Sequence, residues 1–150
     1  MSLLQQIDQD LVEAMKSKDE TNVSTLRMLK SAIHNWQIAN KKEPQDAETM
    51  SVIQKEIKSR QDSIEMYQKG GRQELSAKEE GEIKILKKYL PEQMSEGEIR
   101  TKVQGIISSV GAKGPQDMGK VMGPVMAELK GRADGATCSR IVKEELGNGN

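Results

Sequence analysis

Five basic side chains in the last third of the chain have the clearest potential for chemistry: Lys113, Lys120, Lys130, Arg132 and Arg140. Residues 93–150 hold eight basic and seven acidic residues, so their arrangement matters more than their net charge. The acids gather at the two ends of this segment and leave its middle mostly basic, an arrangement that can dock phosphates. The segment has no aromatic residue on which single-stranded bases could stack. If it binds RNA, we expect it to dock on folded RNA through shape and backbone contacts.

A second pattern in the same segment, residues 114–120 (GPQDMGK), fits the phosphate-binding motif G-x-x-x-x-G-K. A working P-loop requires a buried strand before the motif and a Ser or Thr after its lysine. Here Val121 follows the lysine and a helical pattern precedes the motif. Residues 111–114 (GAKG) fit the clamp of a KH domain, but no sheet is expected to support one. We therefore interpret both patterns as a turn and the start of a helix.

Catalytic and metal-binding side chains are sparse. The single cysteine, Cys138, cannot form an internal disulfide. Together with the single histidine, His34, it also cannot build a structural zinc site. Cys138 falls on the apolar side of the last expected helix, which indicates a buried, inert thiol. His34 lies among ordinary helix residues, with no nucleophile beside it in the sequence pattern. We expect no catalytic residues, no metal and no cofactor.

Three methionines at helical spacing, Met118, Met122 and Met126, form the remaining candidate. Methionine adapts to irregular surfaces, so such a stripe can line a binding groove. Apolar stripes on helices usually face a core, however, and we favour packing inside the C-terminal unit.

Bulk composition limits the class of protein. The chain has 150 residues, 35% hydrophobic content and only 2% aromatics, so its core must be aliphatic. Its 23 basic and 23 acidic residues cancel, which argues against a polyelectrolyte for nucleic acid or membrane surfaces along the whole chain. No stretch approaches the roughly 20 apolar residues of a membrane span. The first ten residues contain two acids and no arginine, so we expect no targeting peptide and a soluble, cytoplasmic protein without membrane contact.

Helical periodicity runs along the chain and predicts an all-α fold. Apolar residues recur every three or four positions within seven stretches: 3–15, 23–36, 50–67, 83–90, 99–110, 118–129 and 138–142. Residues able to start or end helices flank these stretches. The expected N-caps are Ser2, Asp46, Ser76 (with Glu79), Ser95 (with Glu98) and Asp134, and the expected C-terminal stops are Gly70-Gly71, Gly111 and Gly131.

The boundary between two helical domains is expected near Pro91, because a residue before proline is pushed out of the α region. Residues 1–91 would form an N-terminal domain of long helices. Residues 95–147 would form a small C-terminal three-helix bundle, near the lower size limit for independent stability.

Several motifs in order resemble the YqeY family, the stand-alone branch of the GatB/YqeY group. They are residues 25–33 (TLRMLKSAI), 58–67 (KSRQDSIEMY), 71–75 (GRQEL), 82–93 (EIKILKKYLPEQ), 118–126 (MGKVMGPVM) and 130–135 (KGRADG). Residues 95–146 also resemble the tail domain of the B subunit of the bacterial tRNA amidotransferase, a helical unit that helps to grip tRNA. The resemblance implies two helical domains and a tRNA-facing surface. It marks Lys120 and Lys130 as RNA contacts and gives structural roles to Gly119, Met122, Gly131, Asp134 and Gly135.

Three hypotheses about function result. The first is a non-catalytic accessory protein that docks tRNA or another structured RNA through Lys120, Lys130 and Arg132, with Lys113 and Arg140 peripheral. The second is a protein–protein adaptor that binds through helix faces of residues 2–69 or the methionine stripe. The third is a component of a carbon–nitrogen ligase that uses glutamine as amido donor, which the resemblance implies only by kinship.

Overall fold

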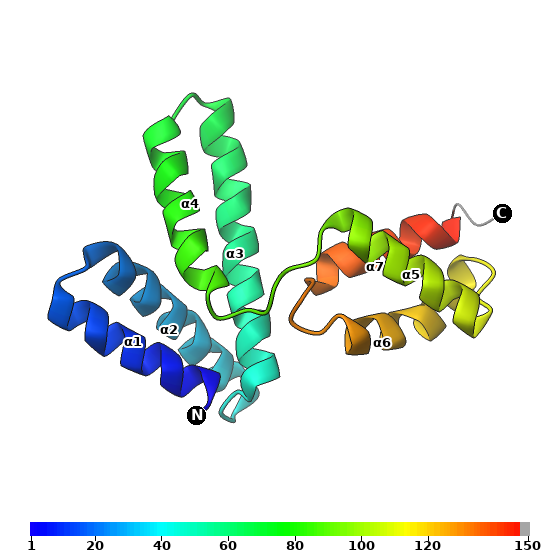
Figure 1. Ribbon diagram of the computed structural model, residues 1–150, viewed down its shortest axis with the longest axis horizontal. Coiled ribbons are helices and arrows are strands. Elements are labelled where there is room, and N and C mark those ends of the chain that lie inside the picture. The colour runs from blue at the N-terminus through cyan, green and yellow to red at the C-terminus, as the bar shows by residue number, and fades with distance from the viewer. Residues whose placement is uncertain (148–150) are drawn as a thin grey trace. The chain divides into compact units, whose positions relative to one another are not determined.

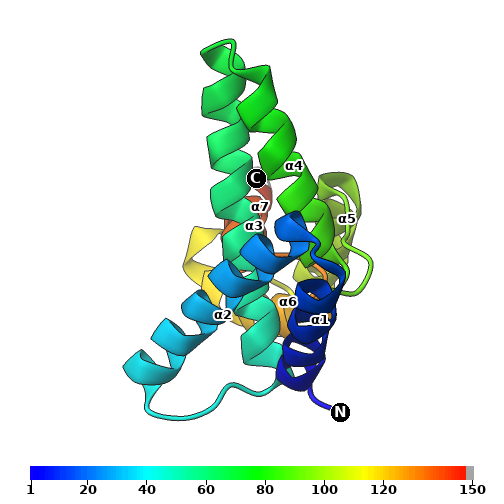
Figure 2. The same ribbon diagram turned by 90° about the vertical axis from the view of Figure 1, so that its left-hand side faces the viewer.

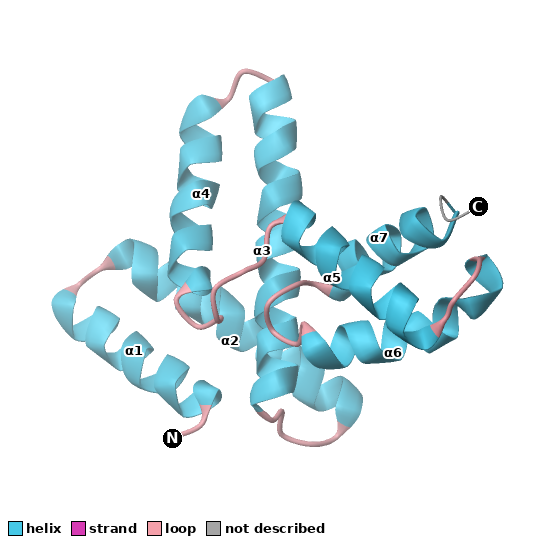
Figure 3. Ribbon diagram, turned by 45° about the vertical axis from the view of Figure 1, so that its right-hand side comes forward, coloured by secondary structure: helices cyan, strands magenta, loops and turns pink. Residues whose placement is uncertain are grey.

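A computed structural model describes residues 1–147, and all regular elements in that range are helical (Figure 3). The helices are α1 (Leu3–Ser17), α2 (Glu20–Asn40), α3 (Asp46–Lys69), α4 (Gln73–Lys87), α5 (Glu96–Val110), the short 3-10 helix η1 (Pro115–Asp117), α6 (Met118–Glu128) and α7 (Gly135–Gly147). The predicted all-α class is therefore confirmed. By its internal contacts the chain divides into two compact units, residues 1–91 and 92–150.

The first unit consists of two helical hairpins, α1–α2 and α3–α4. Figures 1 and 2 both show α3 and α4 running side by side in opposite directions. Buried aliphatic side chains from all four helices form one core: Ile7, Leu26, Leu29, Ile33, Val52, Ile53, Ile57, Ile83, Ile85 and Leu86. Because these residues recur at helical spacing, each helix presents one apolar stripe to the core and a polar face to solvent.

Local capping explains where the first helices begin. Ser2 and Gln5 form a reciprocal capping box at α1, as the N-cap prediction for Ser2 requires. Asp19 caps α2 by accepting a hydrogen bond from the Asn22 amide at 3.2 Å. Lys18, between the two helices, adopts φ 59°, so the chain turns through a left-handed residue without glycine.

Two of the predicted helix starts are wrong. Ser76 does not begin α4, which starts at Gln73, and Ser76 is buried within the helix. The reason is that Gly71, at φ 70°, turns the chain sharply, so that α4 begins directly after Arg72. Asp46 is the first residue of α3 rather than its N-cap, which is Gln45. The Asp46 carboxylate instead accepts a hydrogen bond from the Leu3 amide at 2.9 Å and so joins α3 to the start of α1.

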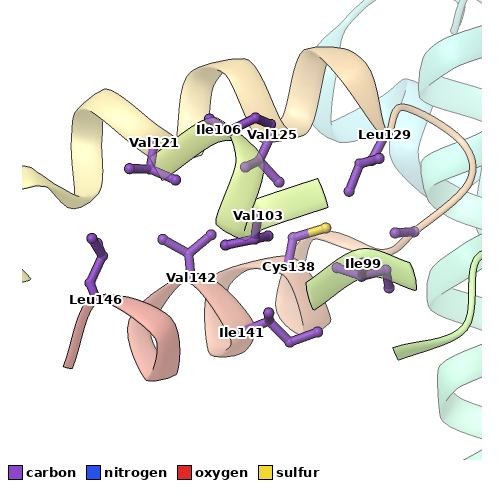
Figure 4. Packing of buried hydrophobic residues seen from close by; sticks show 11 residues of the cluster. Ile99, Val103, Ile106, Val121, Val125, Leu129, Cys138, Ile141, Val142 and Leu146 are labelled. Atoms are coloured by element: carbon purple, nitrogen blue, oxygen red, sulfur yellow. The ribbon is translucent and has the colours of Figure 1, made fainter. Parts of the chain in front are cut away.

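The second unit packs α5, α6 and α7 around an aliphatic core (Figure 4). Its fully enclosed side chains include Val103, Val121, Val125, Cys138 and Ile141. Ser95 and Glu98 form the predicted capping box of α5, and Gly111 ends that helix at φ 70° as predicted. Figure 4 shows the labelled side chains of the three helices converging on one another, with the Cys138 sulfur among them.

The methionine stripe of α6 lies at the edge of the core, so the predicted packing inside the C-terminal unit is confirmed for Met118 and Met122 but not for Met126. Val121 and Val125 are fully buried, whereas Met118 and Met122 are only partly buried at the edge of the core. Met126 leaves 37% of its surface exposed. The valines and the methionines lie on neighbouring faces of the same helix, and the β-branched residues occupy the centre.

Candidate functional site

Small and basic residues form one part of the exposed surface of α6 and of the turn after it, beside the exposed Pro124, Met126 and Glu128. We name it the α6 face and define it as Gly119, Lys120, Gly123, Ala127 and Lys130, all of which are exposed. Helical periodicity produces this face, because the buried stripe of Val121, Val125 and Leu129 turns the remaining positions toward solvent.

The surface of the α6 face is open at its two glycines. A Cβ atom added at Gly119 or Gly123 would have no heavy atom within 4 Å. Neither glycine is therefore required by packing inside the unit. Glycine permits the backbone of a partner to approach a helix closely, since no side chain stands in the way. Gly119, for which the resemblance implies a structural role, lies on this exposed surface.

The lysines of this region are available for contacts. Lys120 lies 3.6 Å from Asp117 and keeps 69% of its side chain exposed, so this surface ion pair is weak. Among the described residues no ion pair holds Lys130, and the charge of the Lys113 side chain acts weakly on Asp117. The Lys113 backbone N–H donates to Asp117 at 2.9 Å. That hydrogen bond, followed by the charge of Lys120, holds the pKa of Asp117 below its usual value and keeps the carboxylate ionised.

Arg132 lies in the turn that leads from α6 to α7. Its Nε donates to the carbonyl of Glu92 at 3.2 Å, and its own carbonyl accepts the Met94 amide at 2.9 Å. The side chain of Gln93 donates to the carbonyl of Gly131 at 2.7 Å. These bonds join the turn to the segment before α5. Arg132 therefore holds a defined position at a half-buried place in the turn, and its charge also acts on Glu98.

Arg140, by contrast, belongs to an ion-pair network of α5 and α7. It contacts Glu96 at 2.9 Å and Glu144 at 3.0 Å. Arg100 contacts Glu144 at 2.8 Å and Glu145 at 2.9 Å. Hydrogen bonds from Arg100 and then Arg140 lower the pKa of Glu144. The acids at the two ends of the segment thus pair with these arginines, so Arg140 has less free charge to offer than Lys120 or Lys130.

The other motif positions have mainly structural contacts. Asp134 caps α7 by accepting hydrogen bonds from the Thr137 amide at 2.7 Å and the Thr137 hydroxyl at 2.9 Å. Gly131 turns the chain at φ 78°, a conformation that favours glycine. A Cβ at Gly135 would lie 3.5 Å from the Met126 methyl group, an ordinary contact. Met122 packs against the core of the unit.

The G-x-x-x-x-G-K pattern forms a turn and a helix start, as interpreted. Helix α5 precedes it, and residues 115–117 form η1 directly before α6. The loop amide of Lys113 is already bonded to Asp117, which removes one donor that a phosphate could use. Cys138 is fully buried, and burial, followed by the charge of Asp134, raises the pKa of its thiol. The prediction of a buried thiol is therefore confirmed, and ordinary thiolate chemistry is disfavoured there.

A buried charge cluster in the first unit was missed by sequence reasoning. Arg60, only 4% exposed, contacts Glu56 at 2.8 Å and Glu82 at 2.9 Å, with Glu79 at 4.0 Å. Glu82 is equally buried. Glu56 and Arg60 are spaced four residues apart, a pattern that usually indicates a solvated helix face. Arg60 and Glu82 do fall within two of the family-like motifs, and that coincidence was the available signal.

Burial affects the protonation of this cluster. Burial, and after it the charge of Glu82, raises the pKa of the Glu79 carboxyl. A partly buried polar contact joins α1 to the turn after α4, where the Tyr89 hydroxyl donates to Asp10 at 2.5 Å. Burial, followed by that hydrogen bond, raises the pKa of Tyr89 and keeps the phenol protonated. Both contacts connect separate helices, so we assign them to the stability of the first unit.

Comparison with known proteins identifies the family. The family model described as Yqey-like protein matches residues 4–146. The chain belongs to the YqeY family. A relative from Pyrenophora tritici-repentis, "Altered inheritance of mitochondria protein 41, mitochondrial", is 33% identical over 97% of this chain and 81% of its own length. The protein of the same name from Lachancea thermotolerans is 36% identical over 73% of this chain and 60% of its own length. An uncharacterised protein of Schizosaccharomyces pombe is 35% identical over 59% of this chain and 72% of its own length.

These relatives contradict the predicted cytoplasmic location, because several of them are named as mitochondrial proteins. The prediction relied on the composition of the first ten residues. Receptors recognise targeting signals in segments that need not take part in the fold, so a helical domain carries little information about its compartment. For the Lachancea relative and a Saccharomyces cerevisiae relative, the matched part is 60% and 44% of their length. Among residues 1–147, no helix is both long and apolar enough to cross a membrane.

Proposed function

We propose that this YqeY-family protein is a non-catalytic accessory protein that docks tRNA or another structured RNA through its second unit. The observation that carries the proposal is the α6 face, where Lys120 and Lys130 flank the exposed small residues Gly119, Gly123 and Ala127. The resemblance of residues 95–146 to the tail domain of the tRNA amidotransferase supports the choice of tRNA. Two relatives are named as mitochondrial proteins, which supports mitochondria as the compartment of the proposed activity.

The electrostatics of the second unit support phosphate binding. Lys120, Lys130 and Lys113 are exposed and weakly paired or unpaired among the described residues, while Arg100 and Arg140 are paired with glutamates. Phosphate contacts from free lysines release counterions and supply most of the salt-dependent affinity for nucleic acids. Arg132 would add a guanidinium at the end of the face nearer the α6–α7 turn.

The shape of the α6 face supports folded RNA over single strands. Gly119, Gly123 and Ala127 carry at most a methyl group, so an RNA backbone could approach the helix at these positions. Residues 92–150 contain no aromatic side chain for stacking. Recognition through backbone and shape is typical of proteins that bind structured RNA. No specific observation favours the carbon–nitrogen ligase alternative, which depends on resemblance alone.

A titration of the full chain with bulk tRNA at low salt tests this proposal. We expect saturable binding that is weakened by a triple charge reversal, Lys120→Glu with Lys130→Glu and Arg132→Glu. The matched control is Lys55→Glu with Lys58→Glu and Lys69→Glu on α3, which changes the net charge equally outside the second unit. Absence of binding by the wild type would overturn the proposal. An equal loss in both variants would overturn the assignment of the site.

A further inference from the structure

A groove on the first unit has no role in the proposed RNA docking. We name it the α2 groove. It has a volume of about 570 Å³ and is lined by Lys18, Glu20, Val23, Ser24, Arg27 and Met28. Lys18 lies in the turn before α2, and the other lining residues follow along the first half of α2, all within the first unit. A failure of RNA docking would therefore not contradict this inference, and a failure of this inference would not contradict RNA docking.

The floor of the α2 groove is apolar and partly fixed. Val23 is partly buried, and Met28 leaves half of its surface exposed. The Met28 sulfur lies 3.8 Å from Nη2 of the buried Arg60, which is held in turn by Glu56 and Glu82. One end of the methionine is thus anchored to the core, while its exposed part can adapt to an apolar side chain.

The rim of the α2 groove carries unsatisfied positive charge. Among the described residues, Lys18 and Arg27 have no ion-pair partner. The neighbouring Lys30 on α2 is different, because it contacts Asp8 at 2.6 Å. The one acid of the lining, Glu20, lies in the first turn of α2, where the helix dipole favours a negative charge. The free charges of the rim therefore favour an acidic occupant.

We propose that the α2 groove docks an acidic amphipathic helix of a protein partner. Apolar side chains of that helix would cover Val23 and Met28, and its carboxylates would pair with Lys18 and Arg27. Helix-in-groove recognition combines an apolar stripe with flanking charges in this way. RNA is the poorer fit, since an apolar floor without aromatic side chains offers its bases no stacking surface. Electrostatic complementarity would select acidic over basic helices.

Two synthetic peptides of about 18 residues, long enough to form helices, provide the test. Both are alanine-based with one leucine stripe, and they differ only in flanking glutamates or lysines. Each is titrated to millimolar concentration into the ¹⁵N-labelled full chain, followed by NMR. We expect the acidic peptide to shift the amide signals of residues 18–28 and the basic peptide to leave them unchanged. No shift with the acidic peptide, or equal shifts with both peptides, would overturn the proposal.

Charge variants define the contacts. Lys18→Glu with Arg27→Glu should weaken binding of the acidic peptide about tenfold, since two partly desolvated ion pairs are lost. The control Lys55→Glu with Lys58→Glu changes the net charge equally on α3 and should have no effect. An unchanged affinity in the first variant would overturn the proposal. A shift of the amide signals of residues 18–28 on addition of tRNA would also overturn it, because RNA would then be the occupant. A shift of the same signals on dilution of the protein alone would overturn it as well, because a second copy of the chain would then be the occupant.

Discussion

Replacement of Arg60 by methionine should destabilise the first unit strongly. Arg60 and Glu82 are 4% and 5% exposed, and the guanidinium holds two carboxylates at 2.8 and 2.9 Å. Arg60→Met leaves Glu82 as an uncompensated buried charge beside Glu56 and Glu79. Breaking a buried pair by removal of one partner costs about 3–5 kcal/mol. Since Glu56 and Glu79 reach water with 24% and 21% of their side chains, we take the lower value, about 3 kcal/mol.

Urea and thermal unfolding followed by circular dichroism measure this loss. For a unit of this size, about 3 kcal/mol corresponds to a decrease in Tm of roughly 12–24 °C. The matched control is Arg72→Met, because Arg72 is 61% exposed and its contact with Glu74 is 3.5 Å long. We expect the control to lower the free energy of unfolding by less than about 0.5 kcal/mol.

A double variant separates the loss of charge pairing from the loss of packing. Arg60→Met with Glu82→Met removes both buried charges and should recover much of the stability that Arg60→Met loses, because apolar pairs can replace buried ion pairs. Our reasoning would be refuted if Arg60→Met cost less than about 1 kcal/mol. It would also be refuted if the double variant were less stable than the single one.

Three further predictions concern local contacts. The pKa of Glu79 is raised by burial and then by Glu82, so its ionised form opposes folding and stability is lost as pH rises through the folded pKa. Glu79→Gln should remove this pH dependence in urea unfolding between pH 4.5 and 8. The prediction would be contradicted if the free energy of unfolding of the variant changed with pH as steeply as that of the wild type. Gly105 lies within α5 with open space at its Cβ, so Gly105→Ala should raise the free energy of unfolding by about 0.5–1 kcal/mol, and a lower Tm would refute this. Asp134→Ala removes the cap on the Thr137 amide and should cost about 1 kcal/mol in urea unfolding, whereas Asp134→Asn should retain most of it.

Short-range signals allowed the helices to be predicted well. Ser2, the Ser95–Glu98 pair and Asp134 act as caps because a cap depends only on atoms within three residues. Ser76 carries the same spacing signal, yet it lies inside α4, since Gly71 starts the helix earlier. A sequence pattern cannot separate these cases when the turn that precedes the helix decides its start.

Contacts between distant residues could not be predicted. Arg60 and Glu82 are 22 residues apart, and only the packing of α3 against α4 buries them together. For the candidate site, the sequence indicated the lysines but not their surroundings. The paired state of Arg140 depends on α5 and α7 lying side by side, and the openness of Gly119 depends on which face of α6 the valines bury.

The salt dependence of tRNA binding tests the proposed function most directly. Each phosphate contact by a lysine contributes about 0.7–0.9 to the slope of log affinity against log salt concentration. Lys130→Ala should therefore weaken binding and reduce the slope by about one, and Lys120→Ala should do the same. Lys55→Ala on α3, an exposed lysine of the first unit, should leave both quantities unchanged. Slopes that are equal in the wild type and in both α6-face variants would contradict RNA docking at the α6 face.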